Sequence, residues 1–493
     1  MITMKKNKIF HLITNPFFAL LILLPIVIMI SLGNMSHDEG MWSYIGRVWS
    51  ENGIPPYVGT IENKTPGIFA LNAISYSLFG VNIFFLRGLG VLSIILSSLV
   101  VYGIGQKIHS HFSGIFSMYI FGLSMTWKLF DGNYIAHTEV FMVLFSTLSF
   151  YFAILGKNRH NWKYWFLFAG LSMGFAIAFK QIALTSAVAL LIFIIVYPTS
   201  TPIKQNKYIL ILLLISGIFI STFFSIIPLI LSGVSIMEYI NGAWLILLNE
   251  GSSSNFKIRL LGFFQIWEFS RIVIFYPYLF LFFFQKELIK NKTFVGLLIW
   301  LIFDFIGVNA SGFYYDHQIK QLLPALSIII GILLSNFLII LKDTSTINGK
   351  HVLTVVITIF IAMFPFQSFI TNEYRLITGS SIPDYDKETG IWLKDNTHKD
   401  DYIYALGSHA SLVSSYSERV SSSKHFSQIF ITTNSELDIL FSELAAQPPA
   451  FITISSLPKD INYLLLEDRR FDTLMKNYIF IHNNNVWNIY KKD

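Results

Sequence analysis

The chain has no cysteine among its 493 residues. A disulfide framework and thiolate chemistry are therefore excluded. Charge is also scarce, because 13% of the residues are charged whereas 54% are hydrophobic, and the mean hydropathy is +0.58. The sequence contains no internal repeat, no heptad array, no low-complexity segment and no glycine-rich phosphate loop. What remains is an apolar chain with long hydrophobic runs, and such runs cross a bilayer as helices.

Hydrophobic runs of membrane-spanning length recur before residue 371, and we expect about 11 spans. The predicted spans are 17–33, 83–105, 112–128, 138–156, 164–179, 181–197, 208–232, 261–284, 293–310, 321–341 and 351–370. A shorter apolar run at 67–80 is predicted to form a helix in the membrane interface. With this assignment, the lysine-rich loops after 156, 203, 285 and 341 share the side of the basic N-terminus, as expected for cytoplasmic loops.

The N-terminus is predicted to be cytoplasmic and the C-terminus to lie outside the membrane. The first span follows Met4-Lys5-Lys6-Asn7-Lys8 and resembles a signal peptide, but no small-residue cleavage site follows it, so we expect it to remain as an anchor. The net charge of +6 belongs mostly to cytoplasmic loops and does not indicate a nucleic-acid partner. A lysine- and isoleucine-rich chain without cysteine suggests the cytoplasmic membrane of a low-GC bacterium.

The composition changes near residue 371, where the chain becomes polar. Strand-like runs occur at 402–406, 450–455 and 478–481, and helical patterns occur near 386–395, 435–446 and 461–476. Residues 371–493 are therefore predicted to form a small extracytoplasmic α/β domain, which is long enough to have its own core.

A helix is predicted to begin after Ser36, because Ser36 and Glu39 have the spacing of a capping box. Its apolar residues fall on one face, and Ser43, Arg47 and Glu51 fall on the other, which is typical of a helix in the membrane interface. Asp38 in the first turn is stabilised as an anion by the helix N-terminus. It is then either a charged acceptor for a hydroxyl or a cation, or only part of a helix cap.

Four loops that carry polar, chemically reactive side chains are predicted to lie on the outer face: 34–66, 131–139, 233–260 and 312–317. Polar residues near membrane depth are costly and often mark a site. Lys180, at the junction of two predicted spans, has no obvious carboxylate neighbour in the sequence, which favours an anionic ligand. Asp304 and Arg271 lie within predicted spans and are candidates to pair across helices.

The order of these motifs resembles the GT-C superfamily of polyprenyl-phosphate-sugar-dependent glycosyltransferases. The resemblance is to the branch of the protein O-mannosyltransferases (glycosyltransferase family 39) and the lipid A aminoarabinose transferases. The matching motifs are Asp38-Glu39 after the first span, Pro55-Pro56-Tyr57, Lys64-Thr65-Pro66-Gly67, Leu78-Phe79-Gly80, Arg87, His137-Thr138-Glu139, His317 with Leu322-Leu323-Pro324-Ala325, Tyr404-Ala405-Leu406-Gly407 and Tyr416-Ser417-Glu418-Arg419. It implies a multi-spanning, all-α GT-C-type membrane domain over residues 1–370, followed by the α/β domain 371–493.

The resemblance also implies a reaction. Members of the superfamily move a sugar from a polyprenyl phosphate in the outer leaflet to a hydroxyl of a lipid, glycan or protein, usually with inversion. Asp38 matches the catalytic carboxylate, and Glu39 is expected to orient the acceptor or to hold the loop. Lys64, Arg87, Lys180, Lys320 and His317 are the candidates for binding the donor lipid phosphate. Asp131, His137 and Glu139 are the candidates for the acceptor or for a second-loop site.

Three departures from the family limit what is carried over. Asn63 precedes Lys64 where the aminoarabinose transferases have an acid, Met41 stands where they have an arginine, and Thr65-Pro66 replaces Pro-Pro. Their substrate and any metal site built on that acid are therefore not transferred. A divalent cation among Asp38, Asp131, His137 and Glu139 stays open, because the ligand types and spacing select no metal.

Two other classes of protein share some of these features. A lipid-linked-sugar flippase is also polytopic with intramembrane charges, but it should have inverted repeats and broken helices near the midplane, whereas here the polar motifs lie in outer loops. A non-catalytic envelope-assembly protein would tolerate Asp38→Asn. The sugar, the acceptor and the prenyl length depend on the shape of the pocket, to which we expect loop 233–260 to contribute most.

Overall fold

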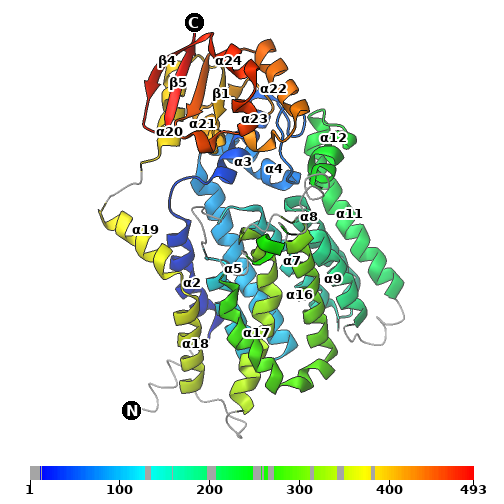
Figure 1. Ribbon diagram of the computed structural model, residues 1–493. Coiled ribbons are helices and arrows are strands. Elements are labelled where there is room, and N and C mark those ends of the chain that lie inside the picture. The colour runs from blue at the N-terminus through cyan, green and yellow to red at the C-terminus, as the bar shows by residue number, and fades with distance from the viewer. Residues whose placement is uncertain are drawn as a thin grey trace. The chain divides into compact units, whose positions relative to one another are not determined.

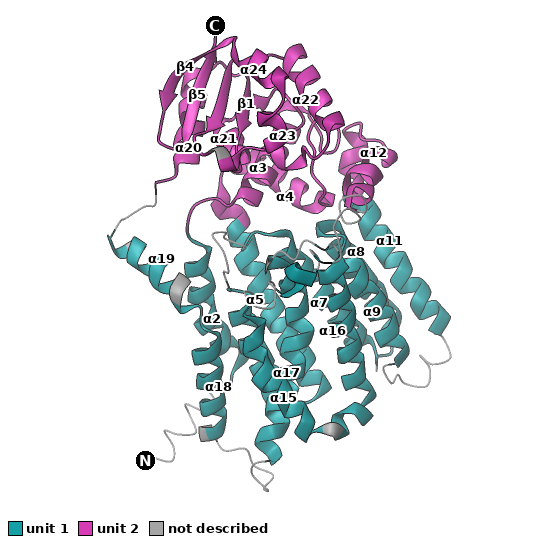
Figure 2. Cartoon of the chain, viewed as in Figure 1, with its two compact units in different colours: residues 1–32, 87–225, 248–378 teal, residues 33–86, 226–247, 379–493 magenta. Residues whose placement is uncertain are grey.

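The computed structural model describes residues 12, 14–127, 135–157, 159–196, 207–247, 257, 260–264, 271–310, 312, 316–340, 349–378 and 383–493. The chain divides into two compact units, which Figure 2 shows in different colours. Unit 1 comprises Met1–Leu32, Arg87–Ser225 and Leu248–Thr378, and unit 2 comprises Gly33–Leu86, Ile226–Leu247 and Gly379–Asp493. Unit 2 thus combines the C-terminal part of the chain with two earlier segments.

Unit 1 is a bundle of helices (Figure 1). Its α-helices are α2 (Pro16–Ser31), α5 (Ile83–Ile108), α6 (His111–Ser124), α7 (Thr138–Gly156), α8 (Trp162–Phe179), α9 (Ala183–Val196), α11 (Lys207–Leu231), α15 (Tyr276–Phe280), α16 (Lys292–Ala310), α17 (Leu323–Ile340), α18 (Gly349–Met363) and α19 (Phe366–Thr378). Short 3-10 helices are η2 (Ile272–Phe275), η3 (Leu281–Phe284), η4 (Lys286–Lys290) and η5 (Asp316–Leu322). The first four residues of α5 and the last six of α11 belong to unit 2.

The core of unit 1 lies between three helix pairs, α7 with α8, α6 with α17 and α9 with α16. Phe150 of α7 stacks on Trp300 of α16 with ring centroids 3.7 Å apart, and both side chains are buried. Gly170 and Gly217 let α8 and α11 approach closely, because a Cβ atom at either position would collide with the backbone of the other helix. Small residues at such crossings are typical of helices that pack in membranes.

Six helices of the described chain are long and apolar enough to cross a membrane. They are Ile83–Ile108, Thr138–Gly156, Trp162–Phe179, Lys207–Leu231, Lys292–Ala310 and His317–Ile340. The multi-pass character of the chain is therefore confirmed, and the count of about 11 spans stays a prediction. The remaining predicted spans that fall on described residues correspond to shorter helices or are interrupted.

Two predicted spans are not continuous helices. Within 261–284 the backbone breaks at Arg271, which has a φ of 53°, and short 3-10 and α-helical pieces follow. Within 351–370, α18 ends at Met363 and α19 begins at Phe366. Pro365 explains the second break, because proline lacks an N–H and disfavours a helical conformation at the preceding residue.

Unit 2 begins with two helices, α3 (His37–Asn52) and α4 (Pro66–Phe79), which pack against each other. Proline at the first position of α4 and Gly80 just after its end fit the usual start and stop of a helix. The predicted helix at 67–80 is thus confirmed as a helix. The middle segment contributes α12 (Ile236–Ile240) and the π-helix η1 (Asn241–Leu245). Tyr239 and Ala243 of this segment are buried, and Tyr239 packs against Tyr57.

The C-terminal part of unit 2 contains a five-stranded mixed sheet in the order β2-β1-β3-β5-β4. The strands are β1 (Tyr402–Leu406), β2 (Val420–Ser421), β3 (Phe451–Ser455), β4 (Tyr478–Asn483) and β5 (Trp487–Lys492). Strand β1 is parallel to β2 and β3, and β5 is antiparallel to β3 and β4. The remaining elements are α20 (Tyr385–Asn396), α21 (Ala410–Ser417), η6 (Gln428–Phe430), α22 (Asn434–Ala446), η7 (Pro458–Asp460), α23 (Tyr463–Leu466) and α24 (Arg469–Met475).

Alternate residues of the sheet face two separate cores. Ile403, Ala405 and Phe451 pack with side chains of α20 and α21 on one face. Tyr404 and Ile452 pack with leucines of α22 and with Leu465 of α23 on the other face. This period of two residues places helices on both faces of the sheet and gives an α/β/α sandwich.

The predicted secondary structure of the C-terminal part is confirmed for the three strand runs and for the three helical patterns, the last of which is split into α23 and α24. Strands β2 and β5 were not predicted. Strand β2 has only two residues, and β5 alternates only from Trp487 to Tyr490 before two lysines, so both signals are too short to stand out in the sequence.

Candidate functional site

Helix α3 begins with the predicted capping box. The backbone N–H of Ser36 donates to the Glu39 carboxylate over 2.8 Å, and the Glu39 N–H donates to the Ser36 hydroxyl over 3.4 Å. Asp38 lies in the first turn, where the helix dipole and the free N–H groups stabilise an anion. Glu39 is therefore part of the cap, and Asp38 is the carboxylate of this turn that the cap does not require.

Part of the polar side of α3 is covered within unit 2, because Ser43 is half-buried and Arg47 is buried whereas Glu51 is exposed; the location of α3 in the membrane interface stays a prediction. Arg47 is 1% exposed, and its Nη2 donates to the backbone oxygen of Arg419 over 2.6 Å. Tyr44 is also buried, and its hydroxyl accepts the N–H of Ser421 over 2.9 Å. Helix α3 is enclosed by α4 and α21 of the same unit. From the sequence alone these side chains are expected to face water, because the residues that cover them lie about 370 positions later in the chain.

Gly46 sets the distance between α3 and α4. A Cβ atom at this position would lie 2.5 Å from Cβ of Asn72 and 2.6 Å from the backbone nitrogen of Ala73. Backbone atoms cannot move aside as a flexible side chain can. The close approach of the two helices therefore requires glycine here.

We expect Gly46→Ala to lower the free energy of unfolding by about 1–3 kcal/mol, because the added methyl group forces α3 and α4 apart. Gly88→Ala is the matched control: Gly88 is also helical, and no atom lies within 4 Å of the added Cβ. That change should be neutral or stabilise by about 0.4–1 kcal/mol. Unfolding of the detergent-solubilised protein measures both, and equal stability of the two variants would contradict the close-packing argument.

The loop between α3 and α4 holds Lys64 beside a buried acid. The Lys64 ammonium donates to Glu62 Oε1 over 3.2 Å and to Asn63 Oδ1 over 2.8 Å. The hydroxyl of Tyr57 donates to the backbone oxygen of Lys64, which fixes the loop locally. Lys64 is thus held by its own loop, and its amide and acid neighbours both orient the ammonium.

Glu62 is a residue that sequence reasoning missed. Its side chain is 1% exposed, and burial raises its pKa. The Lys64 ammonium opposes this increase and the charge of Asp38 adds to it. Glu62 lies one residue before Asn63, the position at which the resemblance to the aminoarabinose transferases implies an acid, so an acid is present close to Lys64. The sequence does contain a signal for this acid, because Glu62 stands two residues before Lys64 instead of directly before it.

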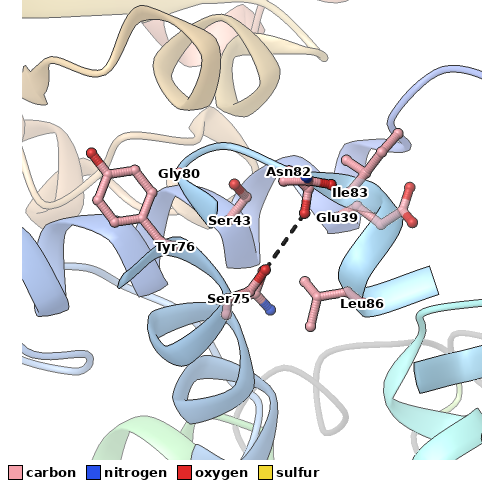
Figure 3. Close-up of a pocket in the computed structure, with 9 residues that line it drawn as sticks. Glu39, Ser43, Ser75, Tyr76, Gly80, Asn82, Ile83 and Leu86 are labelled. Carbon is pink, nitrogen blue, oxygen red and sulfur yellow. Dashed lines mark hydrogen bonds between the residues drawn. The ribbon is translucent and has the colours of Figure 1, made fainter. Parts of the chain in front are cut away.

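A pocket lies between α3, α4 and the start of α5 (Figure 3). Its empty space, open mouth included, is about 310 Å³. The lining residues are Glu39, Ser43, Asn72, Ser75, Tyr76, Gly80, Asn82, Ile83 and Leu86. Ser75 donates to the backbone oxygen of Asn82 across one wall over 3.5 Å. Hydroxyl, amide and carboxylate groups without a lysine or arginine among these nine residues suit a neutral hydroxyl-bearing group better than a phosphate.

In unit 1 the structure brings together four of the predicted site residues. The Lys180 ammonium donates to Glu139 Oε1, and His317 Nε2 lies 3.5 Å from the same oxygen. The other Glu139 oxygen accepts the hydroxyl of Thr138 over 3.0 Å. The rings of His137 and His317 contact edge to face, with centroids 5.2 Å apart. Glu139 is fully buried and Lys180 is 8% exposed, so this is a buried ion pair next to two imidazoles.

This pairing corrects the expectation for Lys180. Lys180 does have a carboxylate neighbour, contributed by α7, although 41 residues separate the two positions. The anionic partner that the sequence left unassigned is therefore Glu139. The ammonium also competes with any metal ion for this carboxylate, because a neutralised carboxylate is a poor cation ligand. A divalent cation elsewhere stays an open question.

The other predicted residues of unit 1 are placed separately. Arg87 is buried, and its Nη1 donates to the backbone oxygen of Ser31 at the end of α2, over 2.9 Å. This contact places a cation at a helix C-terminus, which it stabilises. Lys320 is buried on η5, three residues after His317. Asp131 lies outside the described residues.

Asp304 of α16 forms a separate polar cluster. Its carboxylate accepts the Ser186 hydroxyl over 2.5 Å and the Gln321 amide over 3.1 Å. The pairing with Arg271 that the sequence suggested is thus replaced by two neutral donors. Gln321 lies on η5 and Ser186 on α9, so this cluster joins three elements and fixes η5, which carries His317 and Lys320.

Known proteins share part of this sequence and most of this fold. Residues 63–226 match the family model described as dolichyl-phosphate-mannose-protein mannosyltransferase. Among curated proteins, no sequence matches. The fold is similar to that of ArnT from Cupriavidus metallidurans bound to undecaprenyl phosphate, with 14% identity, 96% of this chain and 97% of that chain covered, and a TM-score of 0.61.

A second similar structure is the archaeal oligosaccharyltransferase AglB from Archaeoglobus fulgidus in complex with an inhibitory peptide and a dolichol-phosphate. The identity is 10%, 97% of this chain and 74% of that chain are covered, and the TM-score is 0.57. Both findings confirm the resemblance that the motifs suggested. The chain has the fold of the GT-C superfamily of glycosyltransferases and, over residues 63–226, the sequence pattern of the mannosyltransferase family model.

Proposed function

We propose that this chain is an integral-membrane glycosyltransferase that moves a sugar from a polyprenyl-phosphate donor to a hydroxyl of a lipid, glycan or protein acceptor on the outer face, with inversion. The observation that carries the proposal is the fold shared over 96% of the chain with a protein crystallised with undecaprenyl phosphate. The family-model match over residues 63–226 supports a phosphoprenyl-sugar donor from the sequence side.

Asp38 serves as the base in this reaction. The acceptor oxygen attacks the anomeric carbon, the bond from that carbon to the phosphate oxygen breaks, and its electron pair leaves with the polyprenyl phosphate. The acceptor proton passes to the Asp38 carboxylate, whose ionised form is stabilised by the N-terminus of α3. Glu39 shapes this turn through its cap and contributes to the pocket wall, so its role is to position the acceptor.

The polar pocket on the same helix supplies neighbours for the acceptor. Ser43, Asn72 and Asn82 offer hydroxyl and amide groups, and Ile83 and Leu86 offer an apolar floor. This combination suits a hydroxyl on a short carbon stem, as found in a sugar hydroxymethyl group or a hydroxyl amino acid. The pocket therefore favours a neutral acceptor hydroxyl over a phosphorylated one.

Cationic side chains stabilise the departing phosphate, on which negative charge develops. Lys64, Arg87, Lys180, Lys320 and His317 are proposed for this role. Lys180 is paired with Glu139, Lys64 is paired with Glu62, and Arg87 contacts the end of α2. Lys64 stands at the motif position of the resemblance, so we expect its removal to weaken binding of the phosphate most. His137 and Asp131 remain proposed for the acceptor side.

We expect a strain that lacks this protein to accumulate one polyprenyl-phosphate sugar and to lose one envelope decoration. Mass spectrometry of lipids, glycans and surface proteins measures both changes and identifies the donor and acceptor together. The full chain should restore the decoration, and the Asp38→Asn variant should not. Loss of the decoration without accumulation of the donor would instead favour a protein that assembles the envelope without transferring sugar.

A further inference from the structure

Helix α19 is a short helix between the last predicted span and the C-terminal part of the chain. It follows α18 after a break at Pro365 and runs at an angle to it (Figure 1). The described part of α18 ends at Met363, and the chain continues in another direction after Pro365.

One face of α19 carries an apolar stripe, formed by Phe366, Ile370, Tyr374 and Ile377. Their exposed fractions are 51%, 59%, 63% and 77%. Spacings of four, four and three residues place them along one side of an α-helix. Monomeric soluble proteins rarely leave such a row of large side chains exposed, so the stripe needs a covering partner.

The rest of α19 is fixed to the helical bundle. The Asn372 side chain is 9% exposed and donates to the backbone oxygen of Met29 in α2 over 2.8 Å. Phe369 packs on Phe364 with ring centroids 5.1 Å apart. These contacts set the rotation of the helix about its axis, so the outward direction of the stripe follows from the packing of α19 against α2.

The apolar surface continues from α19 onto α18, where Ile357 and Ile361 are exposed one turn apart. The chain is a multi-pass membrane protein, and the exposed apolar side of α18 is suited to lipid. Aromatic residues such as Phe366 and Tyr374 are favoured at the boundary between acyl chains and headgroups. The partner that this continuity favours for the stripe is lipid at that boundary.

From these contacts we infer that α19 is an interfacial helix, with Phe366, Ile370, Tyr374 and Ile377 inserted at the acyl–headgroup boundary of the bilayer. The helix carries Glu373 and Arg375, one charge of each sign, so apolar burial rather than attraction to anionic lipid holds it there. Insertion should therefore be the same in zwitterionic and in anionic bilayers, and at low and high salt.

The absence of cysteine allows a direct test in the full-length protein. Ile370→Cys and Ile377→Cys place a nitroxide label on the stripe, and Thr371→Cys and Arg375→Cys place one outside it. In lipid nanodiscs we expect the ratio of oxygen to nickel-chelate accessibility to be at least about fivefold higher at the stripe positions. Tyr374→Cys gives a third stripe position if an isoleucine variant does not yield monodisperse protein.

Equal ratios at the stripe and control positions would overturn the inference, because the stripe would then face water. Spectral broadening at position 370 that disappears on dilution with unlabelled protein would overturn it as well, since a second copy of the chain would then cover the stripe. A ratio that rises only when phosphatidylglycerol is present would contradict insertion driven by apolar contacts. None of these outcomes depends on the glycosyltransferase activity.

Discussion

We expect Asp38→Asn to reduce sugar transfer by about 10²–10⁴-fold, which is the contribution of a positioned general base. Asparagine has the size of aspartate and is accepted in the first turn of a helix, so α3 and its capping box should persist. The lost property is the ability to take the acceptor proton. Turnover of a purified polyprenyl-phosphate sugar, followed as released polyprenyl phosphate, measures the effect.

Two variants separate the chemistry at Asp38 from a general loss of charge. Asp472→Asn removes an exposed carboxylate from the first turn of α24 in the same unit and should leave turnover unchanged. Glu39→Gln keeps an acceptor for the capping box, and its counterpart Glu238→Gln alters the equivalent cap of α12. If Asp38→Asn transfers sugar as fast as Asp472→Asn, Asp38 is not the base of the reaction.

The binding of the donor lipid distinguishes the proposed base from a binding residue. Asp38→Asn should retain its affinity for polyprenyl phosphate, whereas Lys64→Met should weaken it. Lys64 is held by Glu62 and Asn63, so Glu62→Gln should weaken binding less than Lys64→Met does. Loss of donor binding in Asp38→Asn would argue that this carboxylate organises the site rather than acting on the acceptor.

Local features of the fold could be predicted from the sequence because their causes are local. The Ser36–Glu39 capping box depends on four consecutive residues, and the structure forms it as expected. Strands β1 and β3 are short apolar runs with clear borders, and they were found within one residue. The long apolar helices follow from composition alone. In each case the information lies within one helical turn, one strand or one continuous run.

Features that depend on distant parts of the chain could not be predicted. Arg47 was assigned to the exposed side of α3 because nothing near it in the sequence shows that residues 410–421 cover it. Glu139 and Lys180 form an ion pair through the packing of helices, which no spacing rule encodes. Unit 2 also contains segments on both sides of the predicted boundary at 371, and that division stays a prediction of sequence composition.

The covering of α3 has a functional consequence. Asp38 lies on the helix that Arg47, Tyr44 and Ser43 attach to residues 415–421 of the C-terminal part. The α/β sandwich is therefore part of the scaffold that orients the proposed base and is not a separate appendage. A second activity in that sandwich is not needed to explain why it is present.

Lys180→Met is expected to lower the free energy of unfolding by about 3–5 kcal/mol, because it leaves the buried Glu139 carboxylate without its cation. Glu139→Gln should have a similar cost, since it leaves the ammonium buried. The double variant should recover much of the loss, because neither charge then remains unpaired. Unfolding in mild detergent, analysed as a double-mutant cycle, measures this coupling.

The exposed pair Glu287–Lys290 is the matched control, with side chains 82% and 77% exposed. The single variants of this exposed pair should lower the free energy of unfolding by less than about 1 kcal/mol, because water and salt screen an exposed ion pair.

The double variant at Glu139 and Lys180 also separates a structural role of the pair from a role in binding the donor. If it is stable but no longer binds polyprenyl phosphate, Lys180 contacts the donor; if it is stable and binds, the pair only holds α7 to the end of α8. A small cost for both single variants would show that the two charges are not buried together.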